Sequence, residues 1–444
     1  MITCTSYYHL SLNEENTHDI DICILGSYIY SRNNELIIAI PTQIEPFESV
    51  LRAAEIGRPQ YLILLGILSF ITDKAFTVFD SQKTYHQVDD LSLKTFKQEF
   101  IYNGEDYSNQ LMNILDSIEN MDEHSREVIF SALDRWRKAR YMEQQSENNS
   151  LYNDELYISF FHVIELLAES YGQDLNNECE LLTEKYIRNI FGALFISDTD
   201  KFKLNKKLIK EIMFSPLTVT SKIKKMLFKL NLKTEKISGL ISSLVKDRNN
   251  VAHGVSAFQN KVIYPLPPFF PLVKNKENFQ FILVKTLSAR VIDKYLGSNI
   301  WEEKWKHLHK NLPPSSTKIK AKLKTISEQV TNTTSKEISG LINPEILYYY
   351  ILQRKITFQE VEVFFTRFTD IDLDSKLALR LVPILIILLE SKKEKVSLKA
   401  KKIIIELISL DEISKSEIRD LMYEIDYFID KPKIQEIKQI LTNM

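Results

Sequence analysis

The chain has 444 residues, of which 44% are hydrophobic and 26% are charged. This balance predicts an ordinary globular protein with about two to four domains. Its three cysteines, Cys4, Cys23 and Cys179, are scattered and lack CxxC spacing, which argues against a disulfide framework and a zinc site and indicates a reducing compartment. The first residues lack the basic and apolar regions of a signal peptide, so a cytoplasmic protein without a membrane partner is expected.

The net charge of −2 hides a strong internal difference. Residues 1–125 contain 19 acidic and 7 basic residues, whereas residues 201–248 contain 13 basic and 3 acidic residues. A basic segment of this density is suited to binding a polyanion. A solvated face of a lysine-rich helix is the alternative interpretation, because a run of charge is often no more than that.

Residues 1–110 mix strand and helix patterns and predict a small acidic α/β domain. Short β-like runs occur at Tyr7–Leu12, Ile20–Tyr30 and Glu35–Ile40, with a turn signal at Asn33-Asn34. A helical period follows from Glu45 to Ile71, with an expected break near Gly57-Arg58-Pro59, and Ala75–Phe79 is a further candidate strand. The sequence contains neither a GxxxxGKS/T loop nor a GxGxxG loop for binding phosphate.

Residues 111–305 predict a helical domain. Amphipathic periodicity predicts helices at Ser108–Ile118, Ser125–Gln144, Asp154–Tyr171, Cys179–Phe195, Lys203–Met213, Thr220–Leu230, Thr234–Ala252 and Glu277–Tyr295. Gly254 stands where a helix C-cap is expected, and residues 264–271 (YPLPPFFP) predict an extended loop.

Residues 306–335 are polar and lysine-rich, contain Pro313-Pro314-Ser315-Ser316 and predict a linker. Residues 336–444 predict a helical domain, with helices at Pro344–Gln353, Thr357–Thr366, Ser375–Leu389, Ser397–Ile408, Ser414–Ile429 and Pro432–Asn443. Helices of similar length joined by short polar segments indicate an armadillo-like stack of helix hairpins, although no sharp repeat period is present. The chain as a whole is therefore expected to be mainly α.

The predicted helix 234–252 ends in the run Arg248-Asn249-Asn250-Val251-Ala252-His253-Gly254. An arginine is a permanent cation that can hold a phosphate, and a histidine can transfer a proton near neutral pH. On an ideal helix Asn249 and His253 share a face, so Arg248 needs its long side chain, or a loosened last turn, to join them. Two copies around a twofold axis would bring two sets of these groups to one phosphate, which predicts a homodimer.

The RNxxAHG run resembles the signature of the HEPN superfamily, many of whose members are endoribonucleases. Two upstream segments carry the same resemblance, because they look like the opening helices of that family: Ala132–Ala139 (ALDRWRKA) and Asp154–Leu167 (DELYISFFHVIELL). The resemblance covers about residues 120–305. It implies a helical bundle in which Arg248 and His253 line a composite cleft between two protomers, with Glu165 as the polar residue that faces this site.

The activity that these residues and the resemblance imply is cleavage of RNA without a metal or another cofactor. His253 would remove the proton from a ribose 2′-OH, Arg248 would stabilise the charge that develops on the phosphate, and Asn249 would orient a phosphate oxygen or the imidazole. The products would be a 2′,3′-cyclic phosphate and a 5′-hydroxyl. Bacterial relatives with additional domains are often toxins or abortive-infection effectors, so the resemblance also implies a role against phage and a protein or phage-derived trigger.

Each of these residues has a second interpretation. Arg248 and His253 could cap the C-terminal end of the helix, where cations are favoured. His162 lies on an apolar face and favours a packed core histidine, and Glu165 could pair with a cation in the core. For the whole protein the alternatives are a non-catalytic HEPN module for dimerisation or nucleotide binding, and a scaffold whose C-terminal helices bind a protein partner.

Overall fold

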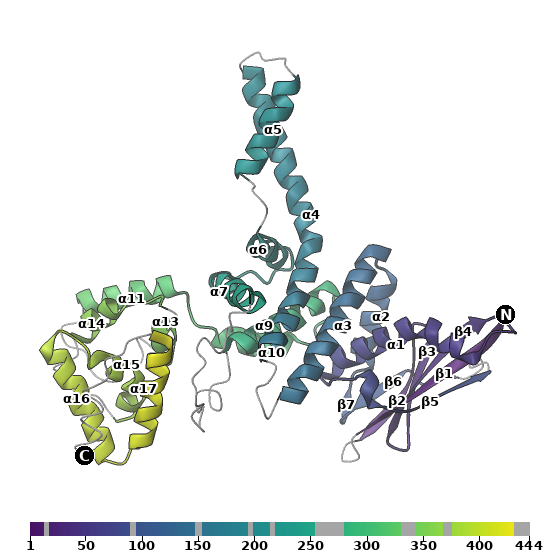
Figure 1. Ribbon diagram of the computed structural model, residues 1–444, viewed down its shortest axis with the longest axis horizontal. Helices are drawn as coiled ribbons and strands as arrows, with labels where there is room; N and C mark the ends of the chain where they lie inside the picture. The colour runs from purple at the N-terminus through teal and green to yellow at the C-terminus, as the bar shows by residue number, and fades with distance from the viewer. Residues whose placement is uncertain are drawn as a thin grey trace. The chain divides into compact units, whose positions relative to one another are not determined.

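The computed structural model describes residues 1–12, 17–88, 95–146, 153–193, 199–213, 218–253, 279–329, 343–352, 354–366 and 375–429. The structure is 68% helix and has an antiparallel sheet at its N-terminal end, which confirms a mainly α chain (Figure 1). The chain divides into two compact units. The first contains Met1–Lys233, the end of α7 (Glu235–Ala252), α9 (Phe279–Tyr295) and α10 (Glu302–Asn311), and the second contains the start of α7 and the chain from Leu312 onward.

The sheet of the first unit has seven antiparallel strands in the order β5-β1-β4-β3-β2-β6-β7. Their bounds are Ile2–Ser11 (β1), His18–Ile24 (β2), Ser27–Arg32 (β3), Glu35–Ile44 (β4), Ser81–Val88 (β5), Glu99–Tyr102 (β6) and Glu105–Asp106 (β7). Both residues of the turn at Asn33-Asn34 have positive φ, as in a two-residue hairpin. A second such turn at Leu25-Gly26 divides Ile20–Tyr30, which the sequence predicted as one run. The end of the predicted strand Ala75–Phe79 instead belongs to a short 3-10 helix, Val78–Asp80.

Helix α1 (Val50–Thr72) covers one face of this sheet. The ring of its Tyr61 stacks on Tyr8 with the ring centroids 4.0 Å apart, and its Ala53 packs with Cys4 of β1. Among the described helices α1 alone is long and apolar enough to cross a membrane, and 56% of its most apolar window is buried within the protein. Burial of this kind is what a core helix lying on a sheet requires.

The break expected at Gly57-Arg58-Pro59 is absent, because α1 is continuous through these residues. Gly57 faces β4, and a Cβ atom at this position would lie 3.3 Å from Cγ2 of Ile40. The glycine therefore allows the helix to lie close to the sheet instead of ending the helix. Packing of the apolar face outweighs the hydrogen bond that Pro59 cannot donate.

The other helices of the first unit are α2 (Ser108–Glu119), α3 (Glu123–Ser146), α4 (Asn153–Ala193), α5 (Thr199–Met213) and α6 (Val219–Lys229). The main difference from the sequence prediction is α4, a single helix of 41 residues where two helices, Asp154–Tyr171 and Cys179–Phe195, were expected. Gly172 and the polar residues after it do not interrupt the helix, since the aliphatic part of Lys222 from α6 packs against Gly172. The expected loop 264–271 and the cap at Gly254 lie outside the described residues.

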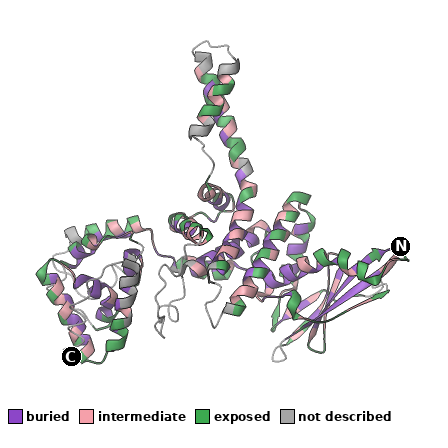
Figure 2. Cartoon of the chain, viewed as in Figure 1, coloured by how far each residue is buried: buried purple, intermediate pink, exposed green. Residues whose placement is uncertain are grey.

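An aromatic cluster joins α1, α3 and α4 at the centre of the first unit. Trp136 of α3 is fully buried and meets Phe160 of α4 at a centroid distance of 5.0 Å and Trp301 at 5.1 Å, both edge to face. Phe70 of α1 lies 5.9 Å from Trp136, and its carbonyl accepts a hydrogen bond of 3.2 Å from Trp301 Nε1. Figure 2 shows the resulting buried stretch along these helices. The cluster fixes α3 and α4 relative to each other.

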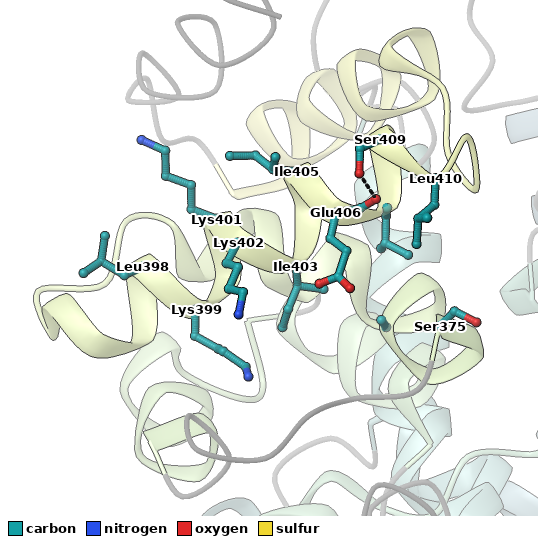
Figure 3. Close-up of a pocket in the computed structure, with 12 residues that line it drawn as sticks. Ser375, Leu398, Lys399, Lys401, Lys402, Ile403, Ile405, Glu406, Ser409 and Leu410 are labelled. Carbon is teal, nitrogen blue, oxygen red and sulfur yellow. Dashed lines mark hydrogen bonds between the residues drawn. The ribbon is translucent and has the colours of Figure 1, made fainter.

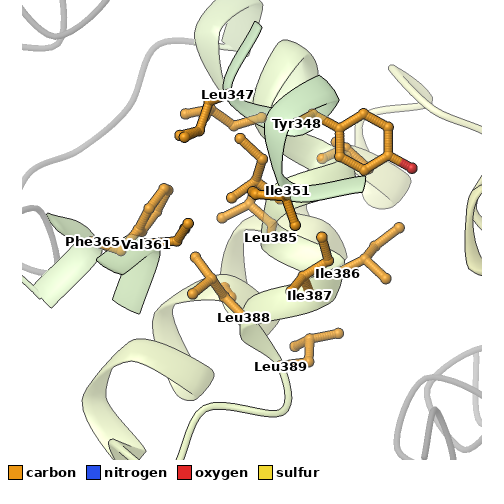
Figure 4. Close-up of a cluster of buried hydrophobic side chains, with 14 of the residues drawn as sticks. Leu347, Tyr348, Ile351, Val361, Phe365, Leu385, Ile386, Ile387, Leu388 and Leu389 are labelled. Atoms are coloured by element: carbon orange, nitrogen blue, oxygen red, sulfur yellow. The ribbon is translucent and has the colours of Figure 1, made fainter. Parts of the chain in front are cut away.

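The second unit is helical throughout its described residues, with α11 (Ser316–Gln329), α13 (Pro344–Leu352), α14 (Phe358–Thr366), α15 (Ser375–Leu388), α16 (Glu394–Ser409) and α17 (Lys415–Ile429). The last five lie close to the predicted positions, whereas the predicted helix Pro432–Asn443 lies outside the described residues. The core includes Leu347, Val361, Phe365 and the run Leu385–Leu389 at the C-terminal end of α15 (Figure 4). A nearly all-apolar helix such as α15 is the element that the others must surround.

Residues 306–335 were expected to be a linker, and they contain the end of α10 and helix α11. Ile319 and Leu323 of α11 are both 3% exposed and belong to the core of the second unit. Their spacing of four residues places both side chains on one face of the helix. Much of this polar, lysine-rich stretch is therefore an amphipathic helix of the second unit. The domain boundary expected near residue 110 stays a prediction.

Candidate functional site

Helix α7 is fixed to α4 one turn before Arg248. The buried hydroxyl of Tyr157 on α4 donates a hydrogen bond of 3.0 Å to the carbonyl of Leu244 on α7. Ile241 and Leu244 are each 1% exposed, so this face of α7 is buried in the first unit. Arg248 follows Leu244 by four residues and therefore leaves the helix on the same side. The apolar period of the helix thus aims the arginine at α4.

Arg248 forms an ion pair with Glu165 of α4. One guanidinium nitrogen, Nη2, lies 2.9 Å from Oε1 and 3.1 Å from Oε2 of the carboxylate. The other, Nη1, donates a hydrogen bond of 3.1 Å to Oδ1 of Asn249. The side chains of Arg248 and Glu165 are 27% and 17% exposed, so the pair lies at the edge of the protein and is only partly covered. Glu165 thus sets the direction of the guanidinium and offsets part of its charge.

His253 lies at the end of the same helix with its side chain exposed. Its backbone N–H donates a hydrogen bond of 3.0 Å to the carbonyl of Asn249, so the last turn is regular and not loosened. Within the described residues its ring has no hydrogen-bonded partner. The structure therefore brings Arg248, Asn249 and Glu165 together in one chain and leaves His253 as a separate, accessible imidazole.

His162 lies beside this group, one turn before Glu165 on α4. Its Nε2 is 3.8 Å from Oε2 of Glu165, and its side chain is 39% exposed, so it is not the packed core histidine that the sequence favoured. Partial burial lowers the pKa of the imidazole below its usual 6.5, and the charges of Arg135 and Arg248 lower it further, while Glu165 opposes this shift. The spacing of three residues between His162 and Glu165 was the sequence signal that could have indicated their proximity.

Arg135 of α3 completes the group and was not singled out from the sequence. Its side chain is exposed, and its charge acts on His162. The next residue, Trp136, packs against Phe160 of α4, which explains why Arg135 stands beside His162. We call Arg135, His162, Glu165, Arg248 and Asn249 the α3–α4–α7 cluster. It carries two guanidinium groups and one carboxylate, which leaves a positive surface next to a titratable ring.

The basic segment 201–248 is partly neutralised by acidic residues of α4. Lys206 pairs with Glu184 at 3.0 Å and Lys222 with Glu169 at 2.6 Å, and Lys225 pairs with Glu178. These pairs hold α5 and α6 against the long helix α4. The charge run therefore has a structural use in addition to the polyanion surface that the sequence predicted.

A hollow of about 760 Å³ lies in the second unit (Figure 3). It is bordered by α16, with Lys399, Lys402 and Glu406 among its lining residues. None of the predicted site residues lines it. Among the described residues, no group of three or more histidine, cysteine, aspartate or glutamate side chains is placed to hold a metal ion.

Comparison of the chain with models of known protein families, with curated proteins and with solved structures finds no match. A functional assignment must therefore start from the residues of the site and from the chemistry that they can perform.

Proposed function

We propose that this protein is an endoribonuclease of the HEPN type that cleaves RNA without a metal ion. The observation that supports this best is the placement of Arg248. Its guanidinium is oriented by Glu165, its side chain remains 27% exposed, and it lies on the helix that leads directly into the accessible His253. A held cation and an accessible imidazole on one helix are the two kinds of group that phosphodiester cleavage by internal attack requires.

In the proposed reaction Arg248 binds the phosphate and stabilises the additional negative charge of the transition state. Asn249 orients a phosphate oxygen, and His253 transfers a proton between the RNA and the solvent. The ribose 2′-oxygen forms a bond to phosphorus, and the bond from phosphorus to the 5′-oxygen breaks. The products are a 2′,3′-cyclic phosphate and a 5′-hydroxyl, and DNA is not a substrate because it lacks the 2′-hydroxyl.

The finer architecture belongs to the same proposal. The helices around α3, α4 and α7 would be a HEPN-type bundle, and two copies would bring their Arg248 and His253 side chains to one composite cleft. The helices α11 to α17 would form an armadillo-like stack. The sequence resemblance also supports a cytoplasmic toxin or anti-phage effector, whose flanking regions respond to a protein or phage-derived trigger.

The proposal predicts cleavage that survives removal of divalent metals. Purified wild type, incubated with total RNA and transfer RNA in EDTA, should produce fragments with cyclic-phosphate ends. His253→Ala should lower the rate by about 10²–10⁴-fold, the usual contribution of a proton-transfer group. His124→Gln, which changes an exposed histidine at the start of α3, should cleave as the wild type does. Full activity of His253→Ala would remove this residue from the mechanism.

One observation favours a second candidate function. The charge of Arg248 is already offset by Glu165 of its own chain, as in a purely structural ion pair. A non-catalytic module for dimerisation or nucleotide binding, or a scaffold for a protein partner, would have the same pair. Such a protein would leave RNA intact in every condition, and Arg248→Ala would change only its stability or its assembly.

A further inference from the structure

Two residues of the α3–α4–α7 cluster, His162 and Arg135, have no part in the mechanism above. Glu165 is close to both His162 and Arg248, and the charge of Arg135 acts on the His162 ring. We propose that His162 is the general base of the reaction and that Arg135 binds the RNA phosphate together with Arg248. This inference rests on the proposed function and extends it. It places phosphate binding and the base within one chain and leaves His253, of the same chain or of a second copy, to act as the acid.

The geometry gives His162 the two neighbours that a general base needs. Oε2 of Glu165 lies 3.8 Å from Nε2 of His162 and 3.1 Å from Nη2 of Arg248, so one oxygen acts on both groups. At 3.8 Å the carboxylate orients the imidazole by charge and not by a direct hydrogen bond. Nδ1 of His162 has no hydrogen-bonded partner among the described residues, which leaves a ring nitrogen for the substrate. In many catalytic sites the base that activates a nucleophile is itself oriented by a neighbouring group, and Glu165 would have this part here.

Partial burial, more than the neighbouring charges, favours the neutral form of His162. Burial has the largest effect on the ring, Glu165 of α4 opposes it, and the charges of Arg135 on α3 and Arg248 on α7 act in the same direction as burial. The nearby cations of α6 and α9 are paired elsewhere: Lys222 with Glu169, Lys225 with Glu178 and Lys285 with Glu143. The pKa of His162 is therefore below the usual value of 6.5, and the ring can accept a proton at pH 7.

Arg135 and Arg248 supply two positive charges around this ring, against the single negative charge of Glu165. A phosphate that binds both guanidinium groups would lie next to the neutral imidazole. The ring then takes the proton of the 2′-hydroxyl while the 2′-oxygen forms a bond to phosphorus. The 5′-oxygen leaves with a proton from His253, so the step is balanced without an oxidant, a reductant or a further reactant.

The test is the dependence of kcat/KM on pH between 5 and 9, measured with the full-length protein and a mixed-sequence single-stranded RNA. The rate of the wild type should rise with pH through a value below 6.5, where His162 loses its proton. His162→Gln should be slower by about 10²–10³-fold at pH 7 and should lose this rise. Because Arg135 lowers the pKa of His162, Arg135→Gln should move the rise to higher pH and increase KM.

His124→Gln serves as the matched control, and it should keep both the rate and the profile of the wild type. Thermal unfolding of each variant identifies loss of fold, and NMR titration of the His162 ring in the wild type and in Arg135→Gln measures the same shift without activity. The inference is wrong if His162→Gln keeps the wild-type rate, or if it is slower but keeps the wild-type rise. A wild type that cleaves no RNA would overturn the proposed function itself, and this inference with it.

Discussion

Replacing Arg248 with alanine is expected to lower kcat/KM for RNA cleavage by about 10²–10³-fold, the usual effect of removing one group that stabilises a transition-state charge. The substitution removes a cation whose position is set by Glu165 and Asn249. It also leaves the carboxylate of Glu165, 17% exposed, beside His162 with no cation in direct contact. The loss should appear mainly in kcat, because phosphate charge increases in the transition state, and initial rates over a range of RNA concentrations measure it.

Two variants separate catalysis from loss of the ion pair. Arg248→Lys keeps the charge but not the two-pronged geometry, so it should recover only part of the activity. Arg380→Ala removes a comparable pair in the second unit, where Arg380 contacts Glu345 through two bonds of 2.7 Å, and it should leave cleavage unchanged. Equal cleavage by Arg248→Ala and the wild type would show that the pair with Glu165 is only structural.

Replacing Trp136 with alanine is expected to reduce the free energy of unfolding by about 3–5 kcal/mol, the range for removing a large aromatic side chain from a core. The indole is fully buried and touches three other rings, those of Phe70, Phe160 and Trp301. These rings come from α1, from α4 and from the residue before α10, so the cavity would weaken the joint between the sheet and the helices. Urea unfolding followed by circular dichroism gives the change.

Trp136→Phe is the graded control, because it keeps an aromatic ring in the same space and should cost less than the alanine variant. Trp136→Ala should also reduce RNA cleavage, since the tryptophan positions α3, which carries Arg135, against α4. An alanine variant as stable as the wild type would mean that the aromatic cluster does not hold these helices together.

Helices α13 to α17 of the second unit could be predicted from the sequence because each carries its own apolar period and is flanked by a polar joint, whereas α11 was expected to be part of a linker. The predicted Ser375–Leu389, for example, corresponds to α15 at Ser375–Leu388. The break expected in α1 was wrong, since Gly57 and Pro59 signal a helix end only when no packing opposes it. Strands β5 to β7 were not predicted, because Ser81–Val88 is mostly polar and gains its structure by pairing with β1.

Only the part of the site that lies within one short stretch of sequence could be predicted. Arg248, Asn249 and His253 lie within six residues of each other, and a local motif can indicate them. His162 and Arg135 belong to the site only because α3, α4 and α7 converge. The contacts that bring these helices together include Trp136 and Tyr157, which are both buried. Long-range proximity of this kind depends on packing, which the spacing of residues along one chain does not reveal.

If the 2′-hydroxyl of RNA is the nucleophile, a matched pair of substrates with and without this group must differ in cleavage. A single-stranded RNA that the wild type cleaves at a known bond is compared, in EDTA, with the same RNA carrying 2′-deoxyribose on the 5′ side of that bond. We expect a cyclic-phosphate end from the first substrate and no cleavage of that bond in the second. Equal cleavage of both substrates would contradict attack by the 2′-oxygen and the role proposed for this site.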